Sequence, residues 1–186
     1  MTISSSASLH NALDFVRHRD HATAGFTIAL TGAMAAALGQ ACVGISKPAA
    51  AGMATHQRLG EIVTGLRDSG DADATALENA LALRAEGKEE EGWDSLLAIP
   101  VRMADLACDG AEALQSFRPH VVDQVHDDME FALHLLAATA RAALLLVESN
   151  LRQWRMPALH AKYGPETERL AARIDALMPL KRIEWT

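Results

Sequence analysis

The chain has few of the residues that commit a small protein to a particular chemistry. Its 2 cysteines, Cys42 and Cys108, are too few and too far apart for a disulfide framework or a thiolate zinc site. Aromatic residues make up only 4%, and β-branched residues never form the alternating run of a strand. A net charge of −7 provides no basic face for phosphate backbones, so nucleic acid is not expected as a partner. An alanine-rich chain of this kind favours helices throughout.

Short catalytic motifs are lacking as well. The sequence contains no GxSxG, no GxxxxGK[ST] and no glycine-rich dinucleotide fingerprint between a strand and a helix. Its N-terminus has neither the positive region nor the apolar run of a signal peptide, so the cytoplasm is the expected location. At 186 residues, 49% of them hydrophobic, we expect one domain that buries around 70% of its surface.

One stretch organises the rest: between His21 and Lys47 there is no charged side chain. Glycines 25, 32 and 39 recur every seven residues, which returns almost to the same side of an α-helix. An interior glycine costs a helix roughly 0.5–1 kcal/mol relative to alanine, so we expect close packing along this line. A membrane span needs only about 20 such residues, but Ala, Gly and Thr give little drive for insertion. We predict a buried central helix and no membrane partner.

Turns and prolines divide the remainder into helices. A Ser69-Gly70 turn is expected to separate two helices, and Pro100 to bend or restart a third. The expected helices cover a short first segment with Leu9, Leu13 and Val16, then residues 50–66, 71–86, 93–117, 121–154 and 165–177. The prediction is an all-α, single-domain bundle over residues 1–186, with six or seven helices around the Ala/Gly-rich one and a C-terminal amphipathic helix at about 165–178.

The densest polar cluster precedes and opens the 121–154 helix. His126, Glu130 and His134 are spaced at i, i+4 and i+8, so neighbours share a face while the outer two are rotated by about 80°. Two of them could bind a metal with ligands from elsewhere, but no HExxH pattern supports it and no metal is expected. Asp127 and Asp128 have a simpler explanation too, because acids are favoured in the first turn of a helix.

Several segments, taken in order, resemble the cyclodeaminase / methenyltetrahydrofolate cyclohydrolase family. Residues Ala22-Thr23-Ala24-Gly25-Phe26 stand where that family has a Pro-Gly-Gly-Gly-Ser loop, and IALTGAMAAAL matches its Ala/Gly helix. Later motifs are echoed by Asp73-Ala74-Thr75-Ala76-Leu77, by Ile99-Pro100-Val101 and by the segment from Asp127-Asp128-Met129-Glu130 to Asn150-Leu151. The resemblance covers about residues 9–155. Only Gly25 of the glycine loop is retained, and Phe26 replaces its serine.

The resemblance implies a dimeric all-α fold and a folate one-carbon enzyme, a hydrolase or lyase whose substrate is a methenyl- or formimino-tetrahydrofolate. It implies Asp128 as the carboxylate that takes a proton, with Lys47 or His126 as its partner. The residues that it places around the folate are Thr23, Gly25, Phe26, Asp73 and Asn150. We therefore expect the start of the central helix and Asp128 to share one pocket.

The lost glycines leave an alternative, a non-catalytic or repurposed dimeric relative that binds another small molecule or a protein. Each carried-over residue also has a structural explanation. Asp128 and Asp73 are acids at helix starts, and Asn150 is a surface residue near a helix end.

Overall fold

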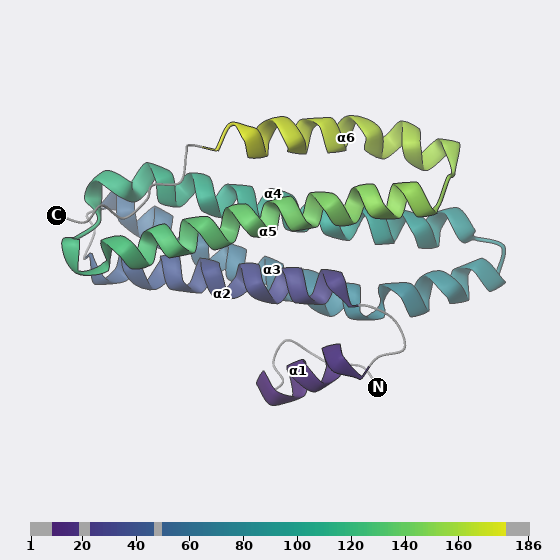
Figure 1. Ribbon diagram of the computed structural model, residues 1–186, viewed down its shortest axis with the longest axis horizontal. Helices are drawn as coiled ribbons and strands as arrows, with labels where there is room; N and C mark the ends of the chain where they lie inside the picture. The colour runs from purple at the N-terminus through teal and green to yellow at the C-terminus, as the bar shows by residue number, and fades with distance from the viewer. Residues whose placement is uncertain (1–8, 19–22, 47–49, 178–186) are drawn as a thin grey trace.

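Six α-helices form the computed structural model, which describes residues 9–18, 23–46 and 50–177 (Figure 1). They are α1 (Leu9–Arg17), α2 (Ala24–Ile45), α3 (Ala50–Ala85), α4 (Glu89–Phe117), α5 (His126–Gln153) and α6 (Pro157–Asp175). Two 3₁₀ turns, Arg118–His120 and Asp123–Val125, join α4 to α5. The described residues contain no strand, and the predicted all-α class is confirmed.

The predicted turn at Ser69-Gly70 is wrong, because α3 runs unbroken through it. The Ser69 hydroxyl donates to the carbonyl oxygen of Gly65 at 2.7 Å, so this side chain is satisfied within the helix. A methyl group at Gly70 would stand 3.1 Å from the Cβ of Ala29, so the missing side chain lets α3 approach α2 closely. The close approach to α2 outweighs the low helix propensity of glycine at this position.

Pro100, where a bend or restart was expected, and Pro165, the expected start of the last helix, both lie inside helices. Helix α4 continues through Pro100, and α6 begins at Pro157 and continues through Pro165. A proline at the first helical position costs no hydrogen bond, which explains the start of α6 at Pro157. Between α3 and α4 the chain turns at Gly87, whose φ of 76° suits glycine.

The glycine line of α2 is buried, as predicted. A methyl group at Gly32 would stand 2.7 Å from Thr139 Cγ2 of α5, and one at Gly39 would stand 2.6 Å from Leu114 Cδ1 of α4. The opposite side of α2 is not buried: Met34 is 61% and Ile45 47% exposed. The expectation of a buried central helix therefore holds for one side of α2 and not for the other.

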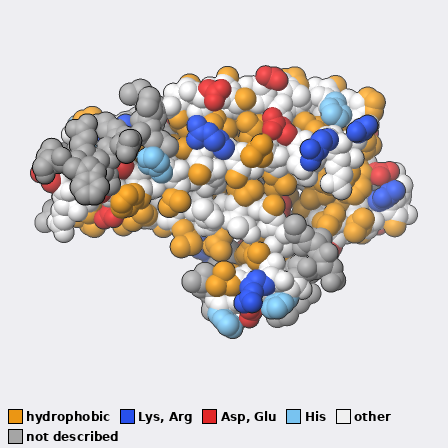
Figure 2. Space-filling model, in the orientation of Figure 1, with side chains coloured by type: hydrophobic (Ala, Val, Ile, Leu, Met, Phe, Trp, Pro, Cys, Tyr) orange, Lys and Arg blue, Asp and Glu red, His pale blue; other side chains and the backbone are white. Residues whose placement is uncertain are grey.

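The exposed side of α2 continues onto α5 as an apolar surface, which we call the α2/α5 face. Its exposed uncharged members include Thr27, Thr31, Met34, Ala37, Ala41 and Ile45 of α2 with Phe131, Leu135, Ala138 and Leu145 of α5. Helix α5 also exposes His134 and Arg141. In Figure 2 hydrophobic side chains spread over α5 and α2, while many charged ones lie along α6 and on α1. By length and composition, residues 24–45 and 123–153 could each span a membrane, although 44% and 50% of the apolar window of each is buried inside the bundle.

The terminal helices pack against the outside of the α2–α5 bundle. Helix α1 contacts α2 and α3 through Phe15, whose ring meets that of Phe26 edge-on at 5.2 Å, and through Ala12. Helix α6 covers α4 and α5 with four buried side chains, Leu159, Tyr163, Leu170 and Ile174. Beside it, the rings of Trp93 and Trp154 stack at 4.6 Å.

Candidate functional site

Helices α2 and α5 lie side by side in opposite directions, and this decides where the predicted site residues lie (Figure 1). Gly32 meets Thr139 near the middle of both helices. Past the end of α2, the Ser46 hydroxyl accepts a hydrogen bond at 3.3 Å from the backbone N–H of Val122, which precedes α5. The start of α5 therefore lies beside the end of α2.

The predicted site residues consequently form two groups at opposite ends of α2. We call the first, residues Thr23–Phe26 with Asp73, the α2 leading end, and the second, His126–Asp128, the α5 leading end. The 22 residues of α2 separate them, a length of about 33 Å at 1.5 Å per residue. Within one copy, the expectation of a single pocket shared by Asp128 and the start of α2 is wrong.

At the α2 leading end, the carboxylate of Asp73 occupies the helix N-terminus. Its Oδ2 accepts a hydrogen bond of 2.9 Å from the backbone N–H of Phe26. A Cβ atom at Gly25 would stand only 2.1 Å from Asp73 Oδ1, so glycine is the residue that fits beneath this carboxylate. The negative charge also suits the positive end of the α2 dipole. Residues 22–26 and 73–77, two of the segments that resemble the family, are thus joined by this hydrogen bond.

Thr23 occupies the N-cap position of α2, but its side chain makes no capping hydrogen bond. An N-cap hydroxyl ordinarily accepts from the second or third helical N–H, and here the third, that of Phe26, is bound by Asp73. The Thr23 residue is 7% exposed, and its Oγ1 is buried without a hydrogen-bond partner. A buried hydroxyl without a partner costs about 1–3 kcal/mol of folding free energy, so Thr23 destabilises the α2 leading end by an amount of this order. Phe26, 1% exposed, packs under α1 and fills space on the other side.

Asn150 lies near this same end but holds the backbone of α4. Its Nδ2 donates to the carbonyl oxygen of Leu96 at 2.8 Å. Pro100 has no N–H to give to that carbonyl four residues earlier, so the Asn150 amide replaces the hydrogen bond that the proline removes. Its Nδ2 is therefore committed to a structural contact.

The α5 leading end carries exposed acids. Asp127 and Asp128 lie in the first turn of α5, and His126 Nδ1 is 3.5 Å from Asp127 Oδ1. The pKa of the Cys42 thiol in α2 is raised by burial and further by the charge of Asp128, which places this carboxylate close to the end of α2. Lys47, the predicted partner of Asp128, lies outside the described residues.

Glu130, one of the three residues considered for a metal, belongs to a buried ion pair instead. Its side chain is 3% exposed, and Arg118 donates to it through Nε at 2.7 Å and Nη2 at 2.9 Å. Such a forked contact satisfies both carboxylate oxygens. Among residues 9–18, 23–46 and 50–177 no group of three His, Cys, Asp or Glu side chains could hold a metal ion. Glu130 lies among apolar residues of α5, and this feature of the sequence could have indicated a buried partner.

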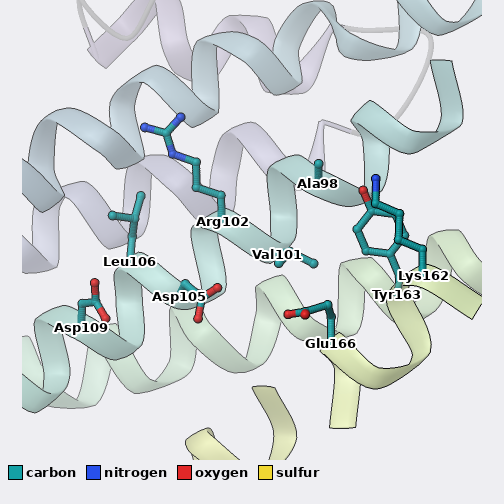
Figure 3. A pocket seen from close by; sticks show the side chains of 9 residues that line it. All are labelled: Ala98, Val101, Arg102, Asp105, Leu106, Asp109, Lys162, Tyr163 and Glu166. Atoms are coloured by element: carbon teal, nitrogen blue, oxygen red, sulfur yellow. The ribbon is translucent and has the colours of Figure 1, made fainter. Parts of the chain in front are cut away.

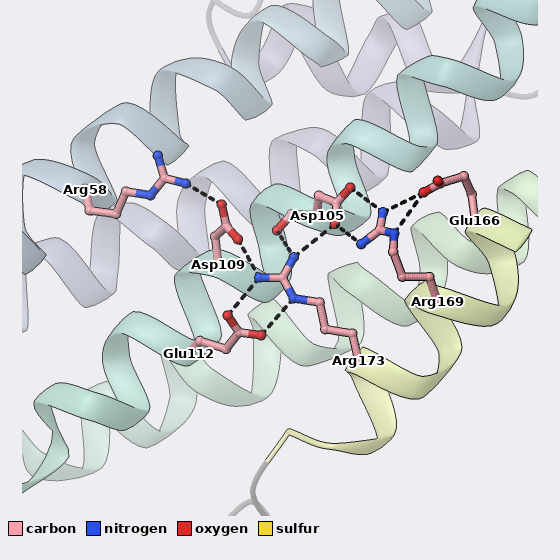
Figure 4. Close-up of polar contacts among 7 residues, drawn as sticks. All are labelled: Arg58, Asp105, Asp109, Glu112, Glu166, Arg169 and Arg173. Atoms are coloured by element: carbon pink, nitrogen blue, oxygen red, sulfur yellow. Dashed lines mark hydrogen bonds and ion pairs between the residues drawn. The ribbon is translucent and has the colours of Figure 1, made fainter.

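A groove of about 520 Å³ lies between α4 and α6 (Figure 3). Ala98, Val101 and Leu106 supply apolar lining, and Asp105, Asp109 and Glu166 line it with carboxylates. Sequence reasoning assigned no role to these acids, and the structure pairs all three with arginines of α3 and α6 (Figure 4). None of the predicted site residues lies in this groove.

The ion pairs of the groove attach α6 to α4. Arg169 donates to both oxygens of Asp105 at 2.8 Å, and Arg173 donates to both oxygens of Glu112, also at 2.8 Å. These carboxylates raise the pKa of both guanidinium groups. The acids of the groove are therefore neutralised within the protein, which indicates a structural role.

Comparison with known proteins supports one family. The model of the formiminotransferase-cyclodeaminase family matches residues 13–169. The fold is similar to the crystal structure of formiminotetrahydrofolate cyclodeaminase from Thermotoga maritima, with a TM-score of 0.83, 19% identity and 92% of each chain covered. At that identity the match shows the fold alone. No curated protein matches the sequence.

Proposed function

Because the chain belongs to the formiminotransferase-cyclodeaminase family, we propose that it is a folate one-carbon enzyme of the cyclohydrolase or cyclodeaminase type. Its substrate would be a methenyl- or formimino-tetrahydrofolate. The observation that carries this proposal is the family match, which spans both leading ends together with the fold that holds them.

Asp128 is the residue that we propose as the proton acceptor. In the cyclohydrolase reaction a water oxygen bonds to the cationic amidinium carbon, its proton passes to a carboxylate, and the ring C–N bond then breaks to leave a formyl group. In the cyclodeaminase reaction a second amine nitrogen of the folate attacks the formimino carbon, which closes the ring, and ammonia leaves. An exposed carboxylate in the first turn of α5 is accessible to such a substrate, and its charge would stabilise the cation. His126, two positions before Asp128 in the sequence, and Lys47 remain the proposed partners.

The α2 leading end supports the folate proposal less directly. Backbone N–H groups at a helix start can bind carbonyl or anionic groups of a ligand, but that of Phe26 already binds Asp73. Together with the buried ring of Phe26, this contact favours the second candidate, a repurposed relative that binds a different small molecule. In both candidates Thr23, Gly25, Phe26 and Asp73 are the residues that would bind the ligand.

We also propose that the protein is a homodimer that buries the α2/α5 face. Met34, Phe131 and Leu145 are 61%, 49% and 64% exposed, although contiguous apolar surface on a lone soluble chain is normally limited. A second copy presents the same exposed apolar side chains. Sedimentation in detergent-free buffer tests this: a dimer supports the proposal, and a monomer contradicts it.

The activity is tested by following the absorbance of methenyltetrahydrofolate with the purified protein. We expect a rate above the spontaneous one that Asp128→Asn abolishes and Asp127→Asn leaves in place. Asp127 is the matched control because it is an exposed acid of the same helical turn. Binding of the folate without turnover would favour the repurposed relative, and the absence of binding would exclude folate.

A further inference from the structure

Helix α5, which carries Asp128 in its first turn, begins without a cap of its own. Val125 is its N-cap residue, and the side chain of Val125 makes no capping hydrogen bond. The first N–H groups of a helix have no partner within the helix, and an oxygen at the N-cap ordinarily binds one of them. In the connection before α5, the N–H of Val121 donates to the carbonyl oxygen of Arg118 at 3.5 Å, a 3₁₀ bond of poorer geometry. The place of Asp128 therefore depends on contacts from outside this first turn.

Arg118 and Glu130 supply such a contact across the whole connection. Arg118 directly follows α4, and Glu130 lies just past the first turn of α5. Their two hydrogen bonds, of 2.7 and 2.9 Å, close the chain segment 118–130 into a loop. A guanidinium and a carboxylate joined by two parallel bonds have a preferred plane and direction, which apolar contacts lack.

The same contact bears on the rotation of α5 about its own axis. Glu130 follows Asp128 by two positions, which is about 200° around a helix, so the two carboxylates leave α5 on nearly opposite sides. The Glu130 side chain is 3% exposed and bound on the inner side, whereas Asp128 is exposed. With Glu130 held by Arg118, the helix keeps Asp128 on the outer side, where a substrate can reach it.

Stability alone does not explain a buried ion pair at this place. Taking two charges out of water costs free energy that their attraction recovers only in part. An apolar pair of similar volume is often equally stable or more stable. What Arg118 and Glu130 add is direction, because their forked contact permits one orientation of the segment that they join.

We propose that Arg118 and Glu130 are positioning residues, which hold the connection between α4 and α5 and thereby direct the Asp128 carboxylate toward the reacting carbon of the substrate. They act through Asp128 and do not touch the substrate. This inference rests on the proposed function, in which Asp128 accepts the proton. A catalytic group misplaced by about 1 Å can cost roughly 100-fold in rate, so the pair influences the reaction from a distance.

The double variant Arg118→Met, Glu130→Leu separates positioning from stability. It removes both charges together and should unfold at nearly the wild-type denaturant concentration, but it cannot form the fork. We expect its kcat with methenyltetrahydrofolate to fall about 10–100-fold, because Asp128 acts in the transition state. Its KM should stay within about two-fold, because the residues proposed to bind the ligand lie at the other end of α2. A wild-type kcat in this variant would overturn the proposal.

A second variant keeps the test decisive if the double variant does not fold. Arg118→Lys retains the positive charge but replaces the planar fork by a single ammonium group. We expect a smaller fall in kcat, again with little change in KM. An unchanged kcat in Arg118→Lys, with no folded double variant to compare, would overturn the proposal.

The matched control is a forked ion pair elsewhere. Arg169 of α6 donates to both oxygens of Asp105 of α4 at 2.8 Å. The double variant Arg169→Met, Asp105→Leu also loses two charges and a fork, and its kcat should remain that of the wild type. A fall in kcat as large as that of the Arg118 and Glu130 variant would show a general effect of lost ion pairs and overturn the specific role.

Hydrogen exchange without folate tests the positioning itself. The amides of residues 120–129 should exchange faster in the Arg118→Met, Glu130→Leu protein than in the wild type, while those in the middle of α5 keep their rates. Unchanged exchange in residues 120–129 would overturn the proposal even if kcat falls. A wild type without folate turnover contradicts the proposed function, whereas the exchange rates still decide whether the pair holds the connection.

Discussion

The side-chain amide of Asn150 donates a hydrogen bond of 2.8 Å to the carbonyl oxygen of Leu96, and thereby closes the gap that Pro100 opens in α4. A proline in a helix leaves the carbonyl four residues earlier without its donor. Residues 96 and 150 come from different helices, so this contact also holds α4 against α5. Two segments that the sequence relates to one family are thus joined by a structural requirement.

Replacing Asn150 by alanine should destabilise the protein by about 1–3 kcal/mol, because the part-buried Leu96 carbonyl then has no donor. The free energy of unfolding in urea measures this loss. In a Pro100→Ala background the backbone N–H of residue 100 can bind Leu96 again, so the same Asn150→Ala change should cost clearly less. Equal costs in the two backgrounds would show that Asn150 acts in some other way.

Two glycines of α2 should respond to alanine with opposite signs. Gly25→Ala places a methyl group 2.1 Å from Asp73 Oδ1, which must break the contact with Phe26, and we expect a loss of about 1–3 kcal/mol. Gly44→Ala puts its methyl group 3.6 Å from the His56 ring in an exposed position. It should gain about 0.5–1 kcal/mol from helix propensity. Thermal unfolding compares the two, and a stabilised Gly25→Ala protein would contradict the capping role of Asp73.

The buried pair of Arg118 and Glu130 should be costly to break from one side only. Glu130→Leu leaves the guanidinium of Arg118, 11% exposed, without its carboxylate, and we expect a loss of about 3–5 kcal/mol. The double variant Glu130→Leu, Arg118→Met removes both charges and should recover most of that loss. Chemical unfolding of the three proteins measures the coupling, and additive losses would argue against a direct pair.

The sequence predicts the fold well where patterns are long and uniform. Residues 24–45 lack charge entirely, and the three glycines correctly indicate the buried side of α2. Ser69 and Gly70 resemble a turn because both residues are common there, whereas their small size serves the approach of α3 to α2. Nothing within α3 itself distinguishes these roles, since the reason for Gly70 lies on another helix.

This single error changes the expected site. Helices joined by short connections alternate in direction, so one extra helix would make α5 start at the same end of the bundle as α2. With α3 unbroken, the start of α5, which holds Asp128, and the start of α2, which holds Phe26, lie at opposite ends of α2. The sequence thus identifies candidate site residues but does not show where they lie relative to one another in the fold. The contacts of Asp73 with Phe26 and of Asn150 with Leu96 depend on helix order and register, which residue patterns do not contain.

The buried thiol of Cys108 should make stability depend on alkaline pH. Burial raises its pKa from 9.0 to about 11, with the nearby Arg173 partly opposing the shift. Above pH 9 the unfolded chain therefore releases this proton while the folded chain still holds it, so the contribution is complete below pH 9 and is lost as the pH rises to about 11. A shift of this size corresponds to on the order of 2–3 kcal/mol. Urea unfolding at pH 8, 9.5 and 10.5 should show a steeper decline for the wild type than for Cys108→Ala. Parallel declines would mean that other groups, such as Tyr163 with its raised pKa, account for the alkaline loss.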